Sequence, residues 1–168
     1  MSFGMYQASI PAFVGMLKNL SAILDKAERY AAAHNIAPEV LLNWRLAPDM
    51  FPLTRQIQIV SDLAKGAAAR LAGREVPSYA DDEKSFAELK ARIAKTAKFL
   101  GGFTAKDIDG SETRDITLSI GDRKLQFKGA PYLVHFVLPN FYFHATAAYA
   151  ILRRCGVELG KRDFLGES

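Results

Sequence analysis

Apolar residues recur every three or four positions in four long stretches, which is the spacing of one face of an α-helix. The stretches cover about residues 9–33 (or 4–33 with a kink at Pro11), 52–72, 85–100 and 131–155. Helix-ending signals support these limits, because Gly73, Gly101 and Gly156 each follow a last apolar turn. Four amphipathic helices predict an all-α, four-helix bundle.

The period changes between the third and fourth helices. Apolar residues alternate with polar ones over 116–120 and again over 125–127, with Gly121-Asp122 between them. A two-residue turn between two such runs predicts a small β-hairpin before the last helix. Since an isolated hairpin is only marginally stable, its apolar face is expected to lie on the bundle.

Two connections and one proline complete the expected layout. Residues 35–51 are longer than a usual helix joint and hold apolar side chains such as Trp44 and Phe51. We expect this connection to cross between the first and second helices and to pack over the mouth of the bundle. Residues 74–82 are expected to be a plain polar joint. Pro139 is expected to kink the last helix.

Composition and charge narrow the class of protein. The 168 residues, 49% hydrophobic and 24% charged, predict one globular domain over 1–168. Lysines and arginines number 22 against 18 acidic residues, but they are scattered, so we expect no nucleic-acid partner. One cysteine, no secretion signal and no membrane-length apolar run predict a cytoplasmic protein without a membrane partner.

The last helix turns two polar groups toward the apolar interior. At about 100° per residue, His144 lies in the middle of the apolar face, and Asn140 lies within about 40° of it. On the second helix, Gln56 lies about 60° from the centre of the apolar stripe, whereas Gln58 and Asp62 fall on the far side. Gln56, Asn140 and His144 are therefore the candidate site residues.

Three interpretations of this trio stay open, in descending order of preference. The two amides can satisfy the ring nitrogens of His144 in a purely structural role. The trio can instead line a pocket for a small organic ligand or for catalysis. His144 can also bind a divalent metal such as nickel or zinc, but amide oxygens are weak ligands, so we favour no metal cofactor. No phosphate-binding loop, nucleophile elbow or HExxH motif occurs, and the sequence defines no particular reaction.

Other candidates lie outside the trio. Arg45 and Asp49 are expected beside the mouth of the pocket as a local ion pair, with a substrate contact as the second interpretation. Tyr142 and Tyr149 fall on the outer face of the last helix, where they would line a helix-to-helix seam in a homodimer. Cys155 falls on the inner stripe, so a buried and inert thiol is expected.

Several runs resemble a known superfamily. His144–Arg153, followed by Gly156, resembles the last-helix signature of the DinB/YfiT-like bundles, in which a ligand histidine is followed by Leu-Arg and then a glycine. The runs LAPDMFP at 46–52, PNFYFH at 139–144 and GKRDFL at 160–165 resemble an uncharacterised branch of that superfamily, a domain of unknown function. The resemblance covers nearly the whole chain.

The resemblance implies an up-down-down-up bundle, frequent homodimers and, in many members, a divalent metal held by three histidines. Some members are thiol-dependent transferases or isomerases. Here only His144 matches the metal ligands, and Gln56 and Asn140 stand at the other two positions. We therefore expect a DinB-like bundle with a polar pocket at the ancestral metal site and no assignable activity. The alternatives are a metal- or thiol-dependent transferase or hydrolase-type enzyme that uses His144, and a non-catalytic dimeric interaction module.

Overall fold

Four long helical segments form the bundle in the computed structural model, which describes residues 3–166. The elements in chain order are α1 (Met5–Ala33), α2 (Pro38–Leu42), α3 (Leu53–Leu71), α4 (Phe86–Leu100), α5 (Ala105–Ile108), β1 (Asp115–Ile120), β2 (Arg123–Lys128), α6 (Gly129–Pro131), the π-helix η1 (Tyr132–Val137), α7 (Leu138–Arg154) and α8 (Lys161–Leu165).

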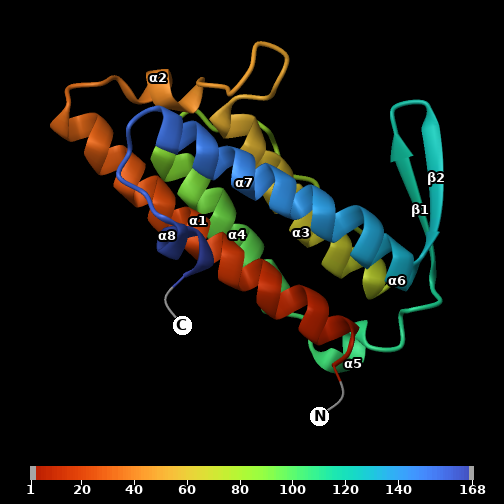
Figure 1. Cartoon of the computed structure of the whole chain (residues 1–168). Helices are drawn as coiled ribbons and strands as arrows, with labels where there is room; N and C mark the ends of the chain where they lie inside the picture. Colours follow the sequence, from red (N-terminus) through yellow and green to blue (C-terminus); the bar gives the residue numbers. More distant parts are fainter. Residues whose placement is uncertain (1–2, 167–168) are drawn as a thin grey trace.

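The bundle has the up-down-down-up order. Figure 1 shows α3 and α4 running in one direction, and α1 and α7 running in the other. The long crossover lies between α3 and α4, at residues 72–85, and not between the first two helices as the sequence suggested. Among the helices of residues 3–166, none is long and apolar enough to cross a membrane.

Helix α1 takes the longer of its two predicted forms, since it begins at Met5 and includes Pro11. Gly4, the residue before it, has no side chain to cap the helix, and the carboxylate of Asp109 accepts the Tyr6 backbone N–H at 2.8 Å instead. A Cβ on Gly4 would lie 2.6 Å from that carboxylate, which explains the glycine. His34 follows the other end of α1, where its Nδ1 lies 2.9 Å from the Tyr30 carbonyl oxygen.

The core consists of the predicted apolar stripes. On α3 the stripe residues are all buried, namely Leu53, Ile57, Val60, Ala64, Ala67 and Leu71. The face of α7 that meets α3 and α1 buries Phe141, Ala145, Ala148, Ile151 and Leu152. Small residues on both helices let α3 and α7 approach closely.

Buried charges fasten the crossover to the bundle. The Arg92 guanidinium on α4, with its side chain 2% exposed, lies 2.9 Å from Glu83, 2.9 Å from Asp62 and 3.0 Å from Asp81. It also donates a 2.8 Å hydrogen bond to the Ala80 carbonyl oxygen. The crossover is therefore tied to α3 and α4 by one arginine.

One prediction about α3 is wrong because of this crossover. Gln58 was expected on the solvent face but is buried, since it donates a 2.8 Å hydrogen bond to Glu83. Asp62 was expected to be a solvated or interface residue, and its side chain is 36% exposed and pairs with Arg92 and Lys65. Burial alone would raise the pKa of Glu83, but hydrogen bonds from Arg92 and Gln58 outweigh it and lower that pKa.

The connection over residues 43–52 packs less than predicted. Leu41 and Leu42 of α2 are buried, but Trp44, Leu46 and Phe51 are exposed. The path of this loop is set by hydrogen bonds instead of apolar packing, because Arg45 donates to the carbonyl oxygens of Pro48 and Met50. The Leu53 N–H donates to the Trp44 carbonyl oxygen at 3.0 Å and closes the loop.

The last helix is irregular before Pro139 and not at it. The π-helix η1 ends at Val137, and Pro139 then falls in the first turn of α7, where its missing N–H costs little. The predicted hairpin is confirmed, with Gly121-Asp122 as its turn. It contacts the bundle through its base, where Ile116 and Leu118 are buried, while Ile120 at the tip is exposed.

The C-terminal helix α8 folds back on α1 and α7. Phe164 packs edge-on against Tyr149 with ring centroids 5.7 Å apart, and the Asn19 side chain donates to the Phe164 carbonyl oxygen. Tyr149 is thereby half-buried, so it is not the open outer residue that was expected. Cys155 is half-buried, and burial raises the pKa of its thiol.

We predict that Arg92→Leu lowers the free energy of unfolding by roughly 3 kcal/mol, because it leaves a buried carboxylate without its partner. Urea unfolding followed by circular dichroism measures the change. Lys90→Leu is the matched control on the same helix, since Lys90 pairs with the half-exposed Asp25 and Glu28. It should cost less than about 1 kcal/mol. Equal stability of the two variants would contradict the role of Arg92.

Candidate functional site

The predicted inward groups of α3 and α7 meet. Gln56 is 1% exposed, and its Oε1 lies 2.6 Å from Nδ1 of His144, which is half-buried. The other end of the same amide, Nε2, donates a 2.9 Å hydrogen bond to the Phe51 carbonyl oxygen. One side chain thus links the 43–52 loop, α3 and α7.

This arrangement fixes the proton on the imidazole. A backbone carbonyl only accepts hydrogen bonds, so the NH₂ group of Gln56 must face Phe51 and its oxygen must face His144. Nδ1 of His144 therefore carries the hydrogen, and Nε2 keeps a lone pair. Burial lowers the pKa of His144, and the positive charge of Arg55 lowers it further. The ring is consequently neutral at pH 7, with Nε2 as an acceptor.

Nε2 of His144 is not fully buried. It has no hydrogen-bond partner within residues 3–166. The fully buried polar side-chain atoms that lack a partner in that range are Ser61 Oγ, Arg92 Nε and Ser111 Oγ. Because Nε2 is unpaired and is not one of these atoms, it keeps some contact with solvent.

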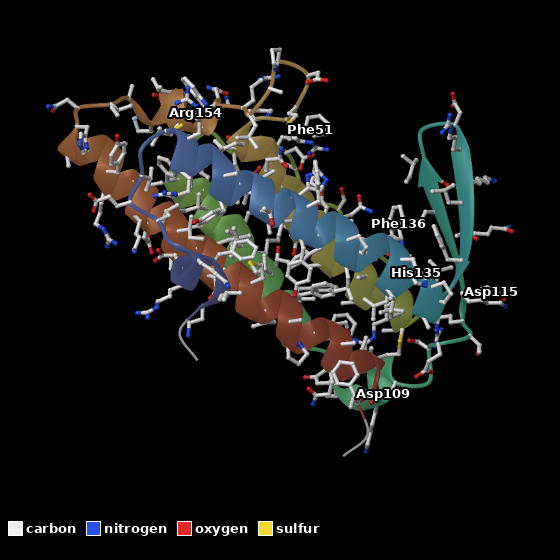
Figure 2. The ribbon with its side chains drawn as sticks, in the orientation of Figure 1. Phe51, Asp109, Asp115, His135, Phe136 and Arg154 are labelled. Carbon is white, nitrogen blue, oxygen red and sulfur yellow. The ribbon has the colours of Figure 1, made fainter. Side chains whose placement is uncertain are left out.

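The third predicted residue, Asn140, lies on the same helix but does not bond to His144. Its Nδ2 donates a 2.6 Å hydrogen bond to the Phe136 carbonyl oxygen, one turn earlier. Figure 2 shows Phe51 in the loop above the start of α3 and Phe136 nearer the hairpin. Each of the two site amides is thus anchored by a different main-chain carbonyl.

Arg45 and Asp49 do not form the expected ion pair within the described residues, because Arg45 binds backbone carbonyls. Two features of the site escaped sequence reasoning. The Phe51 carbonyl carries no sequence signal, since any residue supplies one. Arg55 could have been found from its position, because it directly precedes Gln56 in the sequence. It pairs with Asp81 of the crossover.

These residues do not fit the three-histidine metal site that the resemblance implies. The Gln56 oxygen is occupied by the Nδ1 hydrogen of His144, and Asn140 offers only a neutral amide oxygen. Nitrogen and thiolate donors hold transition metals, whereas neutral amides are weak ligands. Within the described part of the chain, no group of three or more His, Cys, Asp or Glu side chains is placed to hold a metal ion.

The comparisons with known proteins agree with the fold and define the family. A crystal structure of a DinB family member from Shewanella denitrificans matches with a TM-score of 0.87 and 42% sequence identity, over 97% of this chain and 92% of that one. The protein is therefore a DinB-like helical bundle. Residues 5–165 match the family described as a domain of unknown function, DUF1993, and the chain belongs to that family. A search of curated proteins gave no match.

The tautomer and charge of His144 can be measured by NMR of the imidazole ring. We predict protonated Nδ1, unprotonated Nε2 and a pKa below the ordinary value of 6.5. Gln56→Glu should raise the pKa of His144, because a carboxylate at hydrogen-bond distance stabilises the imidazolium. Gln56→Met is the neutral control and should leave that pKa low. A higher pKa in Gln56→Met than in Gln56→Glu would contradict the assignment.

Proposed function

We propose that this protein binds a small organic ligand at Gln56, Asn140 and His144, and that it does so without a divalent metal. The observation that carries the proposal is the clamped amide of Gln56. It holds the imidazole in the tautomer that leaves Nε2 without a hydrogen, and this nitrogen has no partner within residues 3–166 and is not fully buried. A neutral, oriented imidazole is a good hydrogen-bond acceptor for a ligand.

A general base also needs a ring nitrogen without a hydrogen, so ligand binding and proton transfer would both use Nε2 of His144. The enzyme alternative, a metal- or thiol-dependent transferase or hydrolase, would therefore rest on His144 too. Cys155 gives little support for chemistry on the chain's own thiol, because burial raises its pKa and disfavours the reactive thiolate. The candidate metal ligands, one imidazole and two neutral amides, likewise favour a reaction without a metal.

We predict that calorimetric titration of the untagged protein with nickel or zinc shows no tight stoichiometric binding, and that His144→Ala changes nothing. The double variant Gln56→His with Asn140→His should bind about one equivalent tightly, since three imidazoles replace two weak amides. The single variant Gln56→His, which supplies only two imidazoles, is the control and should bind the metal more weakly than the double variant. Tight metal binding by the natural sequence that disappears in His144→Ala would overturn the proposal.

A second candidate function is self-association through an apolar groove between α7 and the 43–52 loop. The groove has a volume of about 410 Å³ and is lined by Leu46, Met50, Tyr142, Phe143, Thr146, Ala147 and Ala150. Phe143 at its rim is 57% exposed, and exposed apolar patches of this kind often mark contact surfaces. The homodimer and the dimeric interaction module are proposals that rest on this groove.

We predict a dimer at micromolar concentration that Phe143→Glu converts to a monomer, because the new charge would be buried in the interface. Sedimentation velocity measures the change. Ile120→Glu, at the exposed tip of the hairpin, is the matched control and should leave the dimer intact. A natural sequence that sediments as a monomer at these concentrations would remove this candidate.

A further inference from the structure

The two amides of the site are both held by their NH₂ ends. Gln56 donates to the Phe51 carbonyl oxygen and Asn140 donates to the Phe136 carbonyl oxygen. Since main-chain carbonyls cannot donate, neither amide can be reversed without losing its hydrogen bond. The donors of both amides are thus used within the protein.

The polar atoms left over are acceptors. His144 Nε2 and Asn140 Oδ1 have no partner within residues 3–166, and neither is one of the fully buried unpaired atoms. Residues four apart on a helix have Cβ atoms about 5–6 Å apart on one face. The two acceptors therefore belong to side chains one helical turn apart, which is the spacing on which we treat them as one site.

The surrounding charge restricts which group this can be. A carboxylate has no hydrogen to donate, so it would place its oxygens against two acceptors, which is repulsive. A cation is disfavoured by the positive charge of Arg55, the same charge that opposes protonation of His144. What fits is a neutral group with N–H or O–H donors.

We infer that His144 and Asn140 recognise the donor end of a neutral group, such as a primary carboxamide or a urea, and discriminate against carboxylates. This inference rests on the proposed function, because it names the class of ligand for the same site. It assigns Asn140 as a specificity-determining residue, through its oxygen, although Asn140 does not touch His144.

Acetamide and acetate are matched probes for this inference, since they have nearly the same shape and differ in donors and charge. The test is NMR of the full chain with labelled histidine at pH 7.5 and constant ionic strength. Acetamide should shift the Nε2 signal of His144 saturably, and acetate should bind at least about tenfold more weakly. Asn140→Leu should weaken acetamide binding about threefold or more, because it removes one acceptor.

Asn43→Leu is the matched control, because Asn43 makes the same local hydrogen bond, to the Glu39 carbonyl oxygen, outside the site. It should leave acetamide binding unchanged. Acetate binding as tightly as acetamide would overturn the inference while leaving the metal-free ligand site in place. No saturable shift with either probe would overturn the inference, and tight metal binding by the natural sequence would overturn the proposed function separately.

Discussion

The hydrogen bond between Gln56 and His144 is the constraint on which the site depends, and its direction is set by a third group. The Phe51 carbonyl oxygen takes the amide hydrogens, so the amide oxygen faces the ring. The tautomer of His144 on α7 thereby depends on the loop that precedes α3. Close packing of α3 on α7 makes this possible, because their small buried residues bring the two backbones together.

The buried charge of Arg92 has a comparable role in setting the path of the crossover between α3 and α4. The crossover between α3 and α4 has few apolar residues to bury, and Arg92 holds it through the carboxylates of Asp81 and Glu83 and the carbonyl oxygen of Ala80. Apolar burial positions the helices, but it does not specify the path of this segment. The site and the crossover are also adjacent, since Arg55 acts on the pKa of His144 and pairs with Asp81.

Apolar periodicity predicts the four helices, the hairpin and the inward direction of Gln56 and His144, because these depend on which face of an element is buried. It misses the burial of Gln58, because that face of α3 is covered by Glu83. Glu83 lies in the crossover, where apolar residues follow no periodic pattern. It also predicts that Asn140 is a hydrogen-bond partner of His144, whereas the Asn140 amide donates to the Phe136 carbonyl oxygen one turn earlier. Side-chain competition for nearby backbone groups leaves no periodic signal.

The Phe51 carbonyl belongs to the main chain, so its place depends on the course of the loop and not on the side chain at position 51. A homologue could keep Gln56 and His144 and still carry the ring hydrogen on the other nitrogen, if one residue were gained or lost between Arg45 and Phe51. Alignment gaps in this loop are therefore as informative about the chemistry of the imidazole as substitutions at the imidazole itself.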